Sequence, residues 1–191
     1  MIARRIGGGL ASALLVGVLA LPGVAAARTL PPAVAAVAGP MQLAGEGEMR
    51  WLGFKLYDAA LWVEARREVG EASPDVDEGE HALVIRYARA ITAERLVEVS
   101  VDEMRRLGER DEARLARWRT LLQQALPSVA AGDTLVGLHR PGRGASFWHQ
   151  GRLTAHIDDA ALARAFFAIW LDERTREPEL RARLLGLADT P

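Results

Sequence analysis

Polar side chains set within apolar, strand-like segments are the residues of this sequence best suited to chemistry. Two such segments, residues 49–64 and 81–91, carry Lys55, Asp58, Arg89 and four candidates for a ligand head group: Arg50 and Tyr57 in the first, Arg86 and Tyr87 in the second. A charged group in an apolar strand must reach solvent, pair with an opposite charge or meet an anionic ligand, because an unpaired buried charge is strongly unfavourable. At the mouth of an apolar cleft, an arginine or tyrosine would bind a carboxylate or carbonyl group. We take these four as candidate ligand-binding residues. The alternative is that each pairs with a neighbour or faces water at a sheet edge.

The other potentially reactive residues do not form a recognisable metal or catalytic site. The four histidines show no i, i+4 pair. His139 and His156 could meet across the three short strand-like pieces that contain them, but histidines on strands are more often structural than metal ligands. Ser146 lies outside a G-x-S-x-G elbow. Asp158 and Asp159 precede a helical pattern, where capping explains them better than catalysis does. The sequence therefore predicts no catalytic residue, no metal site and no cofactor.

The amino terminus has the pattern of a secretory signal peptide. Arg4 and Arg5 precede an uncharged apolar stretch, residues 6–24, and the alanines at 25–27 suit signal peptidase. We expect residues 1–27 to be removed, which predicts a periplasmic protein with no stable membrane span after cleavage. The alternative is an uncleaved anchor, which Pro22 and the glycines at 7–9 disfavour. The two arginines do not complete a twin-arginine motif.

Composition sets limits on the class of protein. Residues 28–41 form an Ala- and Pro-rich lead-in, and residues 42–191 have a length that suits one domain with one core. The chain has 24 basic and 25 acidic residues, which gives no electrostatic case for nucleic-acid binding. The absence of cysteine from the sequence excludes disulfides and thiolate metal sites.

The order of the predicted elements indicates an α+β fold. Strand-like segments at 49–64 and 81–91 are separated by a charged surface loop at 66–80 and followed by helices at 92–108 and 111–126. Three short strand-like pieces then span 134–139, 145–149 and 152–157, and two helices follow Asp159. This order predicts an antiparallel sheet with helices on one side. Trp118, Phe166 and Trp170 recur at helical spacing, which predicts core positions rather than ligand contacts.

Several runs resemble the chalcone isomerase-like family, in particular its bacterial exported branch. They are GFKLYDAALWVE at 53–64, VIRYARAI at 84–91, LPSVAAGDTLVGLHRPG at 126–142, FWHQGRL at 147–153 and FFAIWLDERTREPELRARLLG at 166–186. Their order and spacing cover nearly all of residues 42–186. The resemblance implies a curved antiparallel sheet packed against a helical layer, with a ligand cleft between the two.

The resemblance also implies a choice of function. The plant enzymes of this family close a flavanone ring with the help of an arginine near the start of the first long strand, whereas non-catalytic relatives bind fatty acids through an arginine and a tyrosine. Aligned on Lys55-Leu56-Tyr57, the essential arginine would fall near Gly45-Glu46, and Tyr57 stands where the enzymes have threonine. We therefore expect a non-catalytic periplasmic binder of a small apolar or fatty-acid-like ligand. The alternatives are an isomerase (intramolecular lyase) acting on an unsaturated carbonyl compound, and an interaction domain with a filled core.

Overall fold

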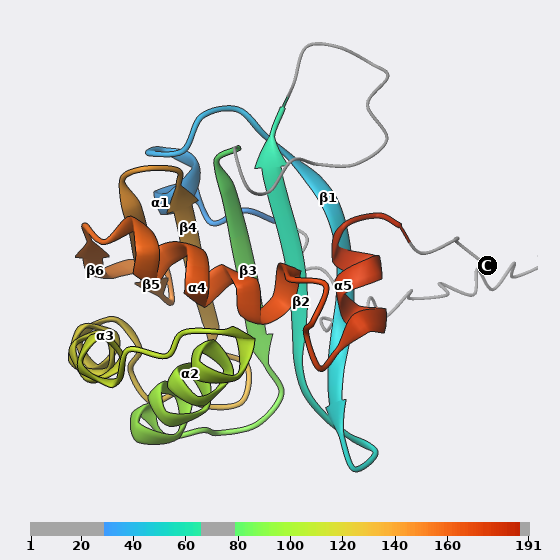
Figure 1. Ribbon diagram of the computed structural model, residues 1–191. Coiled ribbons are helices and arrows are strands. Elements are labelled where there is room, and N and C mark those ends of the chain that lie inside the picture. The colour runs from blue at the N-terminus through green and yellow to red at the C-terminus, as the bar shows by residue number, and fades with distance from the viewer. Residues whose placement is uncertain (1–28, 66–78, 188–191) are drawn as a thin grey trace, which may run out of the picture.

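A computed structural model describes residues 29–65 and 79–187, which form one antiparallel sheet with helices against it (Figure 1). The six strands, neighbours in the sheet in chain order, are β1 (Met41–Trp51), β2 (Phe54–Glu64), β3 (His81–Tyr87), β4 (Thr134–Arg140), β5 (Gly144–His149) and β6 (Arg152–Ile157). The helices are α1 (Pro32–Ala35), α2 (Ala93–Leu107), α3 (Glu112–Ala125), α4 (Ala160–Leu171) and α5 (Pro178–Leu184). The predicted α+β class, an antiparallel sheet packed against a helical layer, is confirmed, and the sheet is open and uncurled.

The predicted signal peptide at residues 1–27 lies outside the described residues, as does most of the predicted loop at 66–80. Part of the lead-in is ordered against the sheet. It forms α1, whose Val34 is fully buried. None of the helices among the described residues is long and apolar enough to cross a membrane.

The first sequence segment is a hairpin and not one strand. Trp51 pairs with Phe54 across a two-residue turn at Leu52 and Gly53, whose φ angles are +49° and +80°. Two central residues with positive φ are typical of the tight turns that join antiparallel strands. The prediction of a continuous strand over residues 49–64 is therefore wrong, and Arg50 lies on β1 while Tyr57 lies on β2.

The central strands are apolar on both faces because both faces are covered. Leu61, Leu83 and Ile85 pack into the core formed with α2, α3 and α4. Val84 and its neighbours on the opposite face form a second, smaller cluster with Val34 of α1. Figure 1 shows α2, α4 and α5 on one side of the sheet and α1 behind it. Continuous apolar strands are the expected pattern for a sheet covered on both sides.

Side-chain caps fix where the helices begin. The Thr92 hydroxyl accepts a hydrogen bond from the Arg95 amide at the start of α2, and the Asp111 carboxylate accepts one from the Arg114 amide at the start of α3. The Asp159 carboxylate accepts from the Leu162 amide (2.9 Å) and also from the Trp118 indole (3.0 Å). Each cap satisfies an amide that has no partner within its helix. The capping role predicted for the pair Asp158–Asp159 is thus confirmed for Asp159.

Candidate functional site: a cleft between the sheet and the helices

A cleft of about 590 Å³ separates the sheet from the helices. Its walls come from β2, β3 and β4 on one side and from α2, α4 and residues 175–180 on the other. Most of the lining side chains are apolar, among them Leu83, Ile85, Leu96, Leu135 and Phe147. A concave apolar site with a few polar groups is the usual form of a small-molecule pocket.

Two of the four predicted site residues, Tyr57 and Tyr87, lie together on the sheet side of this cleft. Their rings meet edge to face with centroids 5.9 Å apart. The Tyr57 hydroxyl accepts a hydrogen bond from the Trp170 indole at 3.0 Å. The Tyr87 hydroxyl has no hydrogen-bond partner among the described residues, although only 6 % of this side chain is exposed.

Both tyrosines are neutral hydrogen-bond donors at ordinary pH. Burial, slightly offset by the hydrogen bond from Trp170, raises the pKa of Tyr57 to about 12. Burial also raises the pKa of Tyr87 well above its usual value, and the neighbouring Tyr57 raises it further. Burial disfavours the charged phenolate because the low-dielectric interior solvates it poorly. The site can therefore donate hydrogen bonds to a carbonyl or carboxyl oxygen.

The other two predicted site residues, Arg50 and Arg86, do not line the cleft. Arg50 is exposed on β1, where its guanidinium is 2.5 Å from the Glu48 carboxylate, and this contact raises the pKa of Arg50. Arg86 is half-buried and lies opposite Asp58 in the β2–β3 ladder. Alternation along β3 directs Arg86 away from the face that carries Tyr87. A ligand-binding role for either arginine stays a prediction.

The cations that line the described cleft are Arg95 and Arg176, which sequence reasoning missed. Each already has a carboxylate partner. The Arg95 guanidinium is 2.7 Å from Glu98, and that of Arg176 is 3.0 Å from Glu103. No local pattern distinguishes these two arginines from the many others in the sequence, because only the packing of α2 against the segment after α4 brings them to the cleft.

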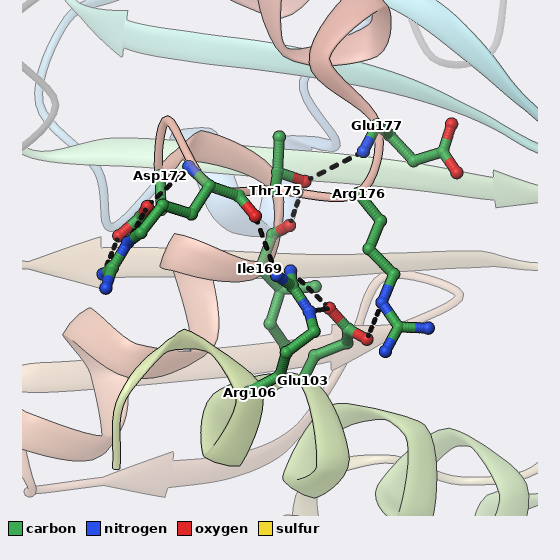
Figure 2. Close-up of polar contacts among 8 residues, drawn as sticks. Glu103, Arg106, Ile169, Asp172, Thr175, Arg176 and Glu177 are labelled. Carbon is green, nitrogen blue, oxygen red and sulfur yellow. Dashed lines mark hydrogen bonds and ion pairs between the residues drawn. The ribbon is translucent and has the colours of Figure 1, made fainter.

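A polar strap, formed by Glu103, Arg106, Arg174 and Arg176, joins α2 to the segment after α4 at one edge of the cleft (Figure 2). The Glu103 carboxylate accepts from Arg106 at 2.8 Å and pairs with Arg176, and Arg106 also donates to the Arg174 carbonyl at 2.8 Å. Just beside it, the Thr175 hydroxyl donates to the Ile169 carbonyl at 2.8 Å. The strap fixes the spacing of the two helices that form one wall of the cleft.

The aromatic residues predicted as core divide into two groups. Trp118 is buried in the core, as predicted. Phe166 also packs in the core but lines the cleft, and Trp170 is half-buried, lines the cleft and holds the Tyr57 hydroxyl. The predicted core positions are therefore confirmed for Trp118 and Phe166, and Phe166 and Trp170 also line the cleft. A helical apolar stripe looks the same in sequence whether it faces a packed core or a cavity.

His139 and His156, which the sequence left as a possible pair, do not meet. His139 packs against His81 of β3, with ring centroids 4.7 Å apart, while His156 bonds to Ser146 through Nδ1 and Oγ at 2.9 Å. His156 lies directly opposite Ser146 in the β5–β6 ladder, so it cannot also reach His139 on β4. No group of three or more potential metal ligands occurs within the described part of the chain.

Gly45, one of the two residues near which the enzymes' arginine would fall, has no room for a side chain. A Cβ atom on Gly45 would lie 1.9 Å from the Arg183 carbonyl oxygen and 2.7 Å from that of Leu184. The backbone of α5 thus occupies the space beside β1 into which an arginine at residue 45 would extend.

Comparison with known proteins agrees with this architecture. The sequence profile described as chalcone isomerase-like matches residues 24–186. A solved fatty-acid binding protein of Arabidopsis thaliana shares the fold with a TM-score of 0.56 at 12% sequence identity, over 75% of this chain and 86% of that chain. No curated protein sequence matches the chain. On the extent of the profile match, this chain belongs to the chalcone isomerase-like family.

Proposed function

We propose that this protein is a non-catalytic binder of a small apolar or fatty-acid-like molecule, which it holds in the cleft between the sheet and α2 and α4. The observation that carries the proposal is an apolar cleft of about 590 Å³ with two buried phenols in its wall. This volume lies within the range of roughly 300–1,000 Å³ usual for small-molecule sites.

The tyrosines define where the polar end of the ligand lies. A buried hydroxyl without a hydrogen-bond partner is unfavourable, and a ligand carbonyl or carboxyl oxygen would provide the partner that Tyr87 lacks. The Tyr57 oxygen accepts from Trp170, which leaves its own proton free to donate to the same ligand oxygen. The apolar part of the ligand would then lie against Leu83, Ile85 and Phe147.

The same geometry argues against the isomerase alternative. A mechanism that needs a fixed cation to hold a developing enolate is not supported where that cation is missing. Both described arginines of the cleft are paired with carboxylates, and neither Gly45, which has no space for a side chain, nor Glu46 supplies the enzymes' arginine. The Arabidopsis neighbour, which is titled a fatty-acid binding protein, supports a binding role at the level of the fold.

Export to the periplasm, in the manner of the family's bacterial exported branch, is part of the proposal. It rests on the basic, apolar and small-residue order of residues 4–27. The intact mass of the protein from a periplasmic extract should correspond to a chain that begins at Arg28. A full-length mass in the membrane fraction would contradict it.

The binding proposal is tested by narrowing the cleft. Leu96 of α2 is half-buried and lines the cleft, and Leu121 of α3 is half-buried and does not. We expect Leu96→Trp to weaken binding of a fluorescent fatty acid about tenfold, since the larger ring takes up space in the cleft. The matched control Leu121→Trp should leave the affinity unchanged.

Two results would overturn the proposal. One is equal affinity of both tryptophan variants and the unmodified protein for the fatty acid, which would place its binding outside the cleft. The other is turnover of a chalcone by the unmodified protein that Leu96→Trp abolishes, which would favour the isomerase.

A further inference from the structure

The tip of the β1–β2 hairpin exposes large apolar side chains to solvent. Trp51 is 60% exposed, Leu52 81% and Phe54 59%. Three large, exposed apolar side chains within four residues of one turn are unusual, because isolated exposed apolar residues are common but contiguous patches mark interaction sites. In Figure 1 this hairpin extends past the ends of the neighbouring strands, so that its tip projects from the sheet.

The backbone at the tip is strained because a leucine, Leu52, adopts a positive φ angle there. Leu52 has φ +49°, in the left-handed region that asparagine or glycine adopts more easily. The β5–β6 turn offers a comparison within the same sheet, since Gln150 takes the same place with φ +50°. Gln150 bonds to Asp133 and to the Thr134 amide, whereas Leu52 gains no such bond and only exposes its side chain. The leucine at this turn is thus costly to the folded protein by itself.

The exposed tip is continuous with the mouth of the cleft. Trp51 lines the cleft, and so does Val99 of α2, which is itself partly open to solvent. An apolar molecule that leaves the cleft on this side passes directly onto the tip. The surface therefore extends the binding site outward and is not a separate patch.

A cation accompanies the apolar tip. The Arg89 guanidinium lies 4.6 Å from the centroid of the Phe54 ring, and no described carboxylate pairs with it. Arg95 lines the mouth close by. Aromatic rings with arginine beside them are the side chains favoured where lipid headgroups meet acyl chains, because such residues have an apolar body and a polar or charged end.

We infer that the tip formed by Trp51, Leu52 and Phe54 inserts into the boundary between headgroups and acyl chains of a lipid bilayer. Arg89 then lies among the lipid phosphates. Lipid-like ligand passes between the bilayer and the cleft past Trp51 and Val99 without crossing water, and this second part rests on the proposed binding function. The strained backbone and exposed side chain of Leu52 make the free protein less stable, and insertion into lipid removes that side chain from water.

The substitution Leu52→Asn tests the inference because it acts in opposite directions on stability and on docking. Asparagine followed by Gly53 is the preferred pair for this turn, so the variant should unfold at a higher temperature than the unmodified protein. Its affinity for vesicles of phosphatidylcholine and phosphatidylglycerol, measured by flotation, should fall roughly tenfold through loss of the inserted side chain. The control Leu153→Asn removes an exposed leucine from β6, away from the cleft, and should leave vesicle binding unchanged.

A second measurement reports on the tip itself, whatever other segment contacts lipid. Brominated lipids should quench the protein fluorescence, and most of this quenching should be lost in Trp51→Phe, because Trp51 is 60% exposed whereas Trp118 and Trp148 are buried and Trp62 and Trp170 are half-buried. Quenching of the same extent in Trp51→Phe as in the unmodified protein would overturn the inference. So would unchanged vesicle binding by Leu52→Asn, or association between copies of the chain that Leu52→Asn abolishes while vesicle binding is absent.

The two proposals fail separately. Leu52→Asn should bind a fluorescent fatty acid from water as the unmodified protein does, since the walls of the cleft are intact. Vesicle docking with no fatty-acid binding would refute the proposed function and leave the docking surface standing. Fatty-acid binding with no vesicle docking would refute the docking surface and leave the proposed function standing.

Discussion

Tyr87 is the residue whose surroundings say most about the ligand. Its hydroxyl lies in an apolar wall, has a pKa that burial raises further above its usual value, and has no partner among the described residues. A phenol that served only the fold would bond within the protein, as Tyr57 does with Trp170.

The substitution Tyr87→Phe should therefore affect binding more than stability. We expect the affinity for a fatty acid to fall about three- to tenfold, the equivalent of one hydrogen bond, with the melting temperature unchanged or slightly raised. Tyr57→Phe is the matched control, since it should also destabilise the protein by leaving the Trp170 indole without its acceptor. Titration calorimetry and thermal melts measure the two effects. A destabilised Tyr87→Phe protein with full affinity would contradict this account.

His81 is a buried titratable group away from the cleft. It is 2% exposed, it packs edge to face on Phe167 at 5.0 Å, and its Nδ1 lies 3.0 Å from the Gly79 carbonyl oxygen. Since that oxygen can only accept, Nδ1 carries the proton of the neutral ring. Burial, followed by repulsion from His139, lowers the pKa of His81 from 6.5 to about 4.

The free energy of unfolding should consequently fall in mild acid. The unfolded chain binds a proton at His81 below about pH 6.5 and the folded protein only below about pH 4, so stability is lost as the pH falls between these values. The loss from this group should reach at most about 3 kcal/mol and should be absent above pH 7. Urea unfolding at several pH values measures it. His81→Phe should flatten the curve in this window, and an unchanged slope in that variant would refute the assignment.

At the scale of elements, the polar strap determines how firmly α2 is held against the segment after α4. The Glu103 side chain is mostly buried and pairs with two arginines, Arg106 of α2 and Arg176 of the segment after α4 (Figure 2). Charged hydrogen bonds in such partly buried places stabilise more than exposed pairs do.

We expect Glu103→Gln to lower the free energy of unfolding by about 2 kcal/mol, because it removes the shared charge. Glu98→Gln, which breaks the exposed pair with Arg95 on the same helix, should cost less than about 1 kcal/mol. Chemical denaturation compares the two variants. Equal effects would mean that the strap contributes no more than an ordinary surface ion pair.

Elements with a local signal were predictable, and those that depend on distant packing were not. The caps at Thr92, Asp111 and Asp159 and the three-stranded meander follow from short-range patterns. The hairpin turn was missed because Leu52 is not a usual turn residue at positive φ. Without one of the usual turn residues at position 52, the pattern of residues 49–64 predicts a single strand.

The residues of the cleft also divide into those with a local sequence signal and those placed only by distant packing. Tyr57 and Tyr87 were accessible from sequence because a polar group in an apolar strand is conspicuous. Arg95 and Arg176 were not, because arginines recur throughout the helices and only the tertiary fold selects two of them. The position of Arg50 could not be predicted without the hairpin turn. Because that turn was missed, Arg50 was expected on the same strand as Tyr57, whereas it lies on β1.

At the scale of the whole molecule, the sheet separates two different interiors. The face toward α1 is closed by Val34, Val84 and Trp148, whereas the face toward α2 and α4 keeps a cleft. An interior that retains such a space forgoes the packing that its own side chains could supply. This retained apolar cleft with two phenols in its wall is the feature on which the proposed binding function rests.

Native mass spectrometry of the protein purified from the cells that make it tests this central claim most directly. We predict a bound species of lipid-like mass, released on denaturation, which is diminished in Leu96→Trp and retained in Leu121→Trp. A protein that carries nothing in all three forms, and whose melting temperature does not respond to added fatty acids, would contradict the account.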